Sequence, residues 1–150
     1  MREAVQSIEI AAAPALVYTI AQDIARWPRL LPHYRYVRIL EESASRRLAV
    51  MAARRDWIPV RWLAEERLKP DIPRIEFTHR GGWTTGMEVA WIFEPLPRGT
   101  RVTITHDLRG LSRPLARSRA GRELIGAFFI QPIASRTLAR IKSLAEEPHG

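Results

Sequence analysis

The sequence predicts an α+β fold in which a curved, seven-stranded antiparallel sheet packs on a long C-terminal helix and encloses a hydrophobic cavity. Residues 121–147 carry an apolar stripe at helical spacing, whereas most earlier segments alternate apolar and polar residues as strands do. Short stretches rich in Gly and Pro join the strand-like segments, which favours antiparallel hairpins. We expect the 150 residues to form one domain, 1–150.

The expected elements follow one another without a repeat or linker. Strand-like residues 4–12 precede a short helix that starts at Pro14, where a proline in the first turn removes no helical hydrogen bond. A second short helix is limited by Pro28 and Pro32. The six further strands are expected at residues 33–42, 46–56, 57–68, 74–80, 83–94 and 100–108, with a turn at Gly81-Gly82.

Pro132 interrupts the long helix. Proline has no N–H, so the carbonyl of Phe128 is left without its helical donor, and the ring crowds that turn. We therefore expect a kink near residues 128–132.

Alternation along the strands indicates which face of the sheet lies inside. The predicted inner residues include Ile58, Val60, Trp62 and Ala64, then Ile75 and Phe77, then Trp83, Met87, Val89, Trp91 and Phe93, then Val102, Ile104 and Leu108. The opposite faces are rich in Arg and Glu, so one side of the sheet is expected to be polar and exposed to solvent and the other side apolar. A sheet of this size offers more concave surface than one helix fills, which predicts a cavity.

Four polar residues fall on the predicted inner face: Glu66, His79, Thr85 and His106. Hairpin pairing puts His106 opposite Val89 and brings His79 near Thr85. Buried polar groups need partners. Either these four are satisfied within a packed core, or they are the polar groups that orient a small ligand in an apolar pocket.

Composition narrows the function classes. The net charge is +8, from 24 basic and 16 acidic residues, but the charges are spread along the chain and no nucleic-acid recognition motif is present. The chain has no cysteine, no HExxH and no ligand spacing among its four histidines, so we expect no metal site and no cofactor. No apolar run reaches the roughly 18 residues of a membrane span, and the cytosol is the expected compartment.

Two long stretches resemble the START-like helix-grip (SRPBCC) superfamily. They are SIEIAAAPALVYTIAQDIARWPRLLPHYRYVRIL, residues 7–40, and WIFEPLPRGTRVTITHDL, residues 91–108. Within that superfamily the chain looks most like the polyketide cyclase/dehydrase group, which includes bacterial aromatase/cyclases. Related members bind lipids, sterols or coenzyme Q without chemistry.

The resemblance implies a catalytic arginine, a tyrosine near the start of the second strand and a glutamine on the last strand. Tyr34 matches the setting of the tyrosine, and His106 stands where the glutamine would be. Arg67 lies near the expected position of the arginine, but alternation places it on the outer face. A bulge or a one-residue offset would be needed to turn it inward.

Two functions from different classes follow. As a cyclase/dehydrase, the protein would fold a poly-β-ketone chain, with His106 or Tyr34 relaying protons and Arg67 stabilising enolate charge. The expected lining residues are Trp27, Trp62, Met87, Trp91 and Phe128, and an acidic acyl carrier protein would suit the basic surface. As a non-catalytic carrier of a lipid or a coenzyme Q-like quinone, it would use His106 or His79 as a hydrogen-bond donor. The basic, apolar-edged segment 108–132 could then rest on an anionic membrane surface.

Overall fold

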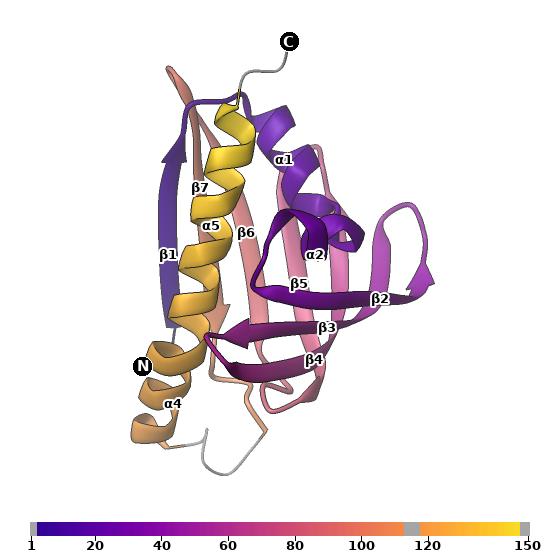
Figure 1. Ribbon diagram of the computed structural model, residues 1–150, viewed down its shortest axis with the longest axis vertical. Helices are drawn as coiled ribbons and strands as arrows, with labels where there is room; N and C mark the ends of the chain where they lie inside the picture. The colour runs from indigo at the N-terminus through magenta and orange to yellow at the C-terminus, as the bar shows by residue number, and fades with distance from the viewer. Residues whose placement is uncertain (1–2, 113–117, 148–150) are drawn as a thin grey trace.

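One antiparallel sheet wraps around the long C-terminal helix (Figure 1). The computed structural model describes residues 3–112 and 118–147. The sheet has seven strands in the order β1-β7-β6-β5-β4-β3-β2, so each neighbouring pair except β1 and β7 is consecutive in the chain. This architecture confirms the predicted α+β helix-grip fold, including the two short helices after the first strand. No helix in the described ranges is long and apolar enough to cross a membrane.

The strands are β1 (Glu3–Ile10), β2 (Tyr34–Glu42), β3 (Arg46–Arg55), β4 (Ile58–Lys69), β5 (Arg74–Gly82), β6 (Glu88–Leu96) and β7 (Gly99–Asp107). The helices before β2 are α1 (Pro14–Gln22), the 3-10 turn η1 (Ile24–Arg26) and α2 (Trp27–Leu30). The C-terminal helix consists of α4 (Arg119–Ile125), the π-helical turn η2 (Gly126–Ile130) and α5 (Gln131–Glu146).

The turn between β5 and β6 differs from the prediction. Gly81 and Gly82 continue β5 opposite Leu63 and Trp62, and the turn comes later, at residues 83–86. Gly86 makes this later turn possible, because its φ is +96° and an added Cβ would lie 1.9 Å from a backbone carbonyl oxygen. The sixth strand therefore starts at Glu88, and Trp83 is 74% exposed instead of facing inward.

The helix interruption at Pro132 takes the form of the π-helical turn η2. The N–H of Gln131 bonds to the carbonyl of Gly126, five residues earlier. The carbonyl of Phe128 accepts a hydrogen bond from Nε of Arg55 at 3.0 Å, and the Arg55 guanidinium lies 4.4 Å from the centre of the Phe128 ring. The end of β3 thus supplies the donor that proline removes from the helix.

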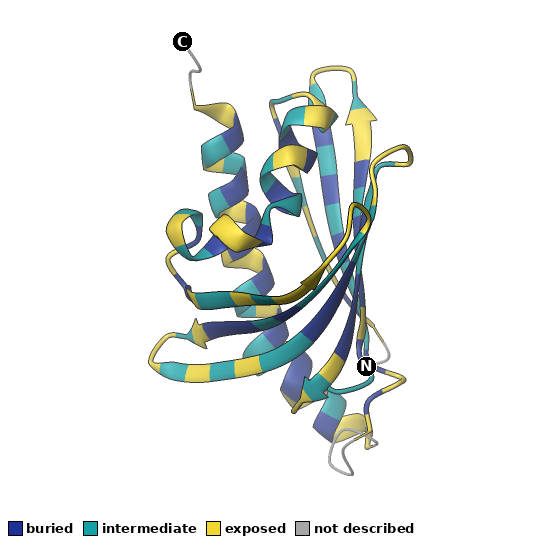
Figure 2. Cartoon of the chain, turned by 90° about the vertical axis from the view of Figure 1, so that its right-hand side faces the viewer, coloured by how far each residue is buried: buried dark blue, intermediate teal, exposed yellow. Residues whose placement is uncertain are grey.

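The helix is held against the concave side of the sheet along its length. Its buried residues Ala134, Thr137, Leu138, Ile141 and Ala145 face the core (Figure 2). Polar contacts fix the other faces: Arg136 to Asp56 at 2.7 Å, Arg140 Nε to the Leu30 carbonyl at 2.8 Å, Lys142 Nζ to the Glu9 carbonyl at 2.9 Å, and Glu146 to the Ala11 N–H at 2.8 Å. These contacts reach β1, α2 and the β3–β4 hairpin, so they set both the position and the rotation of the helix.

We predict that the Arg55 contact depends on Pro132. Arg55→Ala should lower the free energy of unfolding by about 1–3 kcal/mol, because it leaves the Phe128 carbonyl without a donor. In a Pro132→Ala background the helix regains its own N–H donor to that carbonyl, so the loss should be smaller. Denaturant unfolding of the four variants of this cycle measures the difference.

Arg54→Ala is the matched control, since Arg54 is exposed and makes no ion pair in the described part of the chain. An equal loss for Arg55→Ala in both backgrounds would show that the freed carbonyl is not what Arg55 stabilises.

Candidate functional site

A cavity of about 890 Å³, partly open to solvent, is lined by residues of the sheet and of the C-terminal helix. Its inner wall consists mainly of apolar and aromatic side chains. They are Trp27, Tyr34, Met51, Trp62, Phe77, His79, Met87, Val89, Trp91, Ile104, His106, Phe129, Ile130, Ile133, Ala134 and Thr137. Its size is within the range of small-molecule sites, which are typically about 300–1,000 Å³.

Aromatic rings from distant parts of the chain meet at one end of the cavity. Trp27, at the start of α2, packs 5.8 Å from Trp91 of β6 and 5.0 Å from Tyr34 of β2, measured between ring centres. The Trp27 indole is oriented by a 3.1 Å hydrogen bond from its Nε1 to the carbonyl of Ala21. These contacts form a rigid aromatic wall suited to a flat apolar ligand.

His106 lies on β7 directly opposite Val89, the pairing expected from the sequence. Its Nδ1 is buried without a hydrogen-bond partner, and no described residue bonds to either ring nitrogen. Burial lowers the pKa of His106 to about 4, so the imidazole is neutral at neutral pH. A neutral imidazole has one donor and one acceptor, and here neither is used by the protein.

His79 lies on β5, close to His106. Its ring stacks on Trp62 with 5.5 Å between centres and 4° between planes, and its Nδ1 is 2.6 Å from Oγ1 of Thr84. Burial lowers the pKa of His79 to about 3, and the neighbouring His106 adds to this effect. The cavity thus holds two neutral imidazoles on adjacent parts of its wall.

The predicted partner of His79, Thr85, was wrong by one residue. The Thr85 hydroxyl donates to the carbonyl of Gly82 at 2.6 Å within the turn and does not line the cavity. Thr84 takes its place because the turn comes after Gly82 and not at it. The sequence indicated that a polar residue would lie beside His79. Which threonine it would be depended on where the turn between β5 and β6 begins.

Tyr34 lines the cavity and is buried. Burial raises the pKa of its phenol above the ordinary value, with Thr137 acting in the opposite direction, so the group keeps its proton. Thr137 of α5 donates to the Ile133 carbonyl at 2.8 Å, so its oxygen accepts from Nε2 of His33, also 2.8 Å away. Neither His33 nor Thr137 was among the predicted site residues. The hydroxyl of Thr137 within the apolar stripe of the helix is the feature of the sequence that could have indicated this pair.

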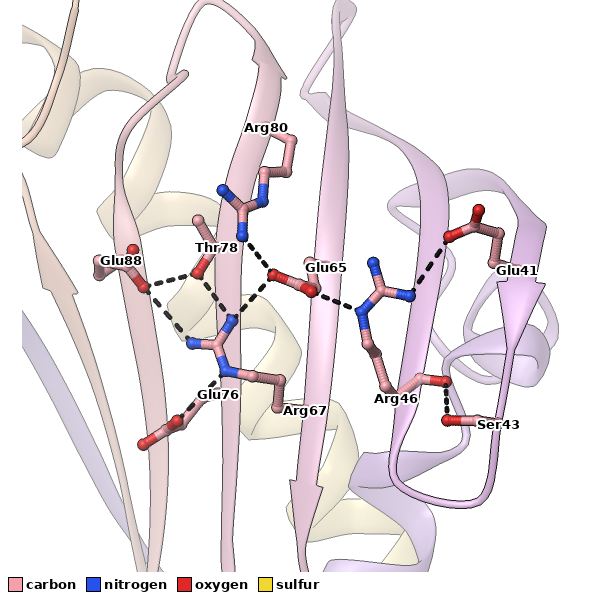
Figure 3. A network of polar contacts seen from close by, with 9 residues as sticks. All are labelled: Glu41, Ser43, Arg46, Glu65, Arg67, Glu76, Thr78, Arg80 and Glu88. Atoms are coloured by element: carbon pink, nitrogen blue, oxygen red, sulfur yellow. Dashed lines mark hydrogen bonds and ion pairs between the residues drawn. The ribbon is translucent and has the colours of Figure 1, made fainter.

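Arg67 is not in the cavity. Its side chain lies on the outer face of the sheet, at the centre of the polar network in Figure 3. Its guanidinium donates to Thr78 at 2.8 Å and pairs with Glu65 at 3.3 Å and Glu76 at 3.4 Å. The β3–β4 register has no offset at this position, so alternation keeps Arg67 outside. The arginine that the resemblance implies is therefore not supplied by Arg67.

Phe128 is also absent from the cavity wall, where Phe129 takes its place. The π-helical turn accommodates an extra residue, so the phase of the helix shifts and Phe128 points toward Arg55.

Glu66 faces inward but lies under α1, away from the cavity wall. It is fully buried, with Oε1 2.8 Å from Nη1 of Arg47 and Oε2 without a partner. Arg47 also donates to the carbonyl of Gln22 at 2.6 Å, which ties the end of α1 to the sheet. Burial, against the attraction of Arg47, raises the pKa of Glu66 to about 7. Glu66 therefore contacts the Arg47 that holds α1 against the sheet, and it does not line the cavity.

In the described ranges, no three His, Asp or Glu side chains come together as metal ligands would. Of the predicted site residues, the structure brings Trp27, Tyr34, Trp62, His79, Met87, Trp91 and His106 onto one cavity wall. Thr85, Arg67, Phe128 and Glu66 lie elsewhere.

Comparison with known proteins extends these observations. Residues 10–129 match the family model described as "Polyketide cyclase / dehydrase and lipid transport". A Streptomyces cyaneus protein named as a candidate polyketide cyclase is 29% identical over 107 residues, covering 67% of this chain and 68% of that protein.

Solved structures share the fold. The Zhui aromatase/cyclase from Streptomyces sp. R1128 has a TM-score of 0.82 at 20% identity, over 97% of this chain and 93% of that one. A START superfamily protein from Mycobacterium smegmatis has a TM-score of 0.73 at 17% identity, over 95% of this chain and 98% of that one.

We predict a stability change with pH that arises from Glu66. The folded state holds the proton up to about pH 7, whereas the unfolded chain loses it near 4.5, so stability falls as the pH rises between these values. The shift corresponds to about 3 kcal/mol. Glu66→Gln cannot ionise, so the difference in unfolding free energy between wild type and this variant should change by that amount across this range.

Glu94→Gln is the control, because Glu94 is exposed and unpaired among the described residues. A parallel pH dependence for wild type and Glu66→Gln would contradict the assignment.

Proposed function

Because this chain belongs to the polyketide cyclase/dehydrase and lipid transport family, we propose that it binds a hydrophobic, aromatic or polyketide-like small molecule in its cavity. The observation that carries the proposal is the cavity of about 890 Å³ with two neutral imidazoles on an otherwise apolar and aromatic wall. Burial of a flat ring system against Trp27, Trp62 and Trp91 supplies the affinity. His106 and His79 fix the orientation by bonding to a carbonyl or a phenol of the ligand.

The geometry also supports a chemical step, aldol cyclisation followed by loss of water. His106, neutral and unpartnered, takes a proton from a CH₂ group between two ketones of the bound chain. The resulting enolate carbon bonds to a second carbonyl carbon, and the new alkoxide regains a proton from the imidazolium. Removal of a second α-proton with departure of the hydroxyl as water gives the ring double bond. The cavity wall holds the chain folded for this reaction.

The pKa values set the roles of the two polar groups in this scheme. The low pKa of His106 makes protonation unfavourable in the empty cavity, but the enolate formed beside it favours the imidazolium. Tyr34, whose pKa is raised, remains a phenol and can donate to a developing alkoxide. Arg67 takes no part, because it lies on the outer face.

One observation favours a non-catalytic carrier of a lipid or a coenzyme Q-like quinone. Among the described residues, the inner wall has no cation to stabilise an enolate, and a base with a pKa of about 4 is weak. The same wall would hold a quinone ring through its carbonyls.

Two partners are proposed on the basis of charge. The net charge of +8 suits an acidic acyl carrier protein that would deliver a polyketide chain. For the carrier function, the basic segment 108–132 would rest on an anionic membrane surface, although Arg113 and Arg117 of that segment lie outside the described residues.

We predict that His106→Leu weakens binding of dihydroxyanthraquinone about 5- to 10-fold, because one hydrogen bond is lost while the apolar wall remains. Quenching of tryptophan fluorescence measures this, since Trp27, Trp62 and Trp91 lie on the inner wall of the cavity. Arg67→Ala, outside the cavity, should leave the affinity unchanged. Equal affinity of wild type and His106→Leu, or no binding at all, would contradict the proposed site.

Turnover separates the two functions. With a synthetic poly-β-ketone, a cyclase should form a dehydrated cyclic product, and His106→Leu should slow this by about 10²- to 10⁴-fold. Binding without turnover, together with a stoichiometric lipid or quinone released from the purified protein on denaturation, would decide for the carrier.

A further inference from the structure

The cavity opens sideways, between the β3–β4 hairpin and the β5–β6 turn. Pairing of β4 with β5 begins at Trp62 and Gly82, so residues 58–61 of β4 have no partner on β5. The β3–β4 hairpin therefore extends past the neighbouring strand toward the helix (Figure 1). The lining of the cavity includes residues from the outer face of the sheet as well as from the inner wall.

The outer-face residues form a shallow groove across β2, β3 and β4. Its lining residues on the outer face include Tyr36, Arg38, Val50, Arg61, Leu63 and Trp83. Strand register places Arg38, Val50, Leu63 and Gly81 in one row across four strands. The row ends at Gly81, which has no side chain to fill the groove. A Cβ at this position would lie 3.3 Å from the Leu63 side chain.

The groove is lined by two arginines without carboxylate partners, unlike the polar network beside it. Arg46, Arg67 and Arg80 all have carboxylate partners in the network of Figure 3. Arg38 and Arg61 are exposed and have no ion pair or side-chain hydrogen bond within the described residues. Arg38 stacks over the Tyr36 ring at 5.7 Å, which orders its guanidinium beside the groove.

The inner wall and the groove therefore favour opposite ends of a ligand. A charged group would lose its hydration in the apolar cavity and would find no countercharge among the described inner-wall residues, so it is excluded there. At the outer end, two unpaired guanidinium groups favour a carboxylate or a phosphate, which arginine binds with paired hydrogen bonds. The two arginines stand on β2 and β4, two strands apart and offset by two residues along the strands, so their backbones are about 12 Å apart, a span that their long side chains can close.

We propose that Arg38 and Arg61 form an anion subsite for the outer end of the cavity ligand, which is an elongated molecule with an apolar ring system and a terminal carboxylate or phosphate. This inference rests on the proposed function, because it requires the cavity to hold the apolar part. It defines the ligand class more narrowly than the cavity does: neutral sterols and hydrocarbons would use only the inner wall.

Three fluorescent probes with one ring system test the subsite: pyrenebutanol, pyrenebutyrate and pyrenebutyl phosphate. Wild type should bind the two anions about 10-fold more tightly than the alcohol, and added salt should reduce this ratio. Arg61→Ala and Arg38→Ala should each weaken binding of the anions about 5-fold and leave binding of the alcohol unchanged. Arg98→Ala removes the same charge from the exposed β6–β7 turn and should change neither.

The outcomes separate the two proposals. Equal affinity for all three probes, or an anion preference that survives in both groove variants, would overturn the subsite while leaving the cavity proposal intact. No binding of any probe would overturn the cavity proposal and with it the subsite. A stronger preference for the phosphate supports a phosphate-bearing arm as the natural source of the anion, and a stronger preference for the carboxylate supports a free acid.

Discussion

The concave face of the sheet is broader than the single long helix that covers it. The seven strands are polar and solvent-exposed on one side and apolar on the other, so the apolar side must be buried. Helix α5 covers only part of it. Contacts from Asp56, Leu30, Glu9 and Ala11 fix the helix in place, so it cannot shift to close the remaining space. The cavity is the consequence of this mismatch, and its aromatic lining comes mainly from the strands that the helix leaves uncovered, with Trp27 added from α2 and Phe129 from η2.

The same sheet separates charge between its two faces. On the outer face, Glu65 accepts from Arg46 and Arg80, and these bonds lower its pKa to about 2, whereas inside, burial keeps His79 and His106 neutral. An interior without cations selects uncharged ligand groups, and the unpaired arginines beside the side opening favour a charged end outside. Binding specificity would then require a ligand with one uncharged end, which can be buried in the cavity, and one charged end, which stays at the surface. The family and the fold are compatible with both catalysis and transport, so the proposed chemistry rests on His106 as the base and Tyr34 as the proton donor.

Much of the fold and of the candidate site could be predicted from the sequence. Alternation correctly placed His106 opposite Val89 and Arg67 on the outer face, and the missing proline N–H identified the Phe128 carbonyl as the group that needs a new donor. These inferences follow from local periodicity or from one residue's chemistry, which the sequence contains.

The rest depends on three-dimensional register. A Gly-Gly pair is a turn signal, yet glycine is also tolerated in a strand, so the true start of β6 and the partner of His79 were misplaced. The π-helical turn shifts the helix phase by a residue and replaces Phe128 with Phe129 on the wall, an effect that no periodicity shows in advance. Recognising the Arg47 partner of Glu66 and the side opening required knowing how far each strand extends past its neighbour.

An NMR titration of the histidine ring nitrogens, with and without dihydroxyanthraquinone, tests whether the two imidazoles face a ligand-binding cavity. We predict that His106 and His79 stay neutral down to about pH 4 and about pH 3, and that the ligand shifts their ring signals while those of His33, bonded to Thr137, change least. If His106 instead titrates near its ordinary value of 6.5 and does not respond to the ligand, the imidazoles do not face a ligand-binding cavity.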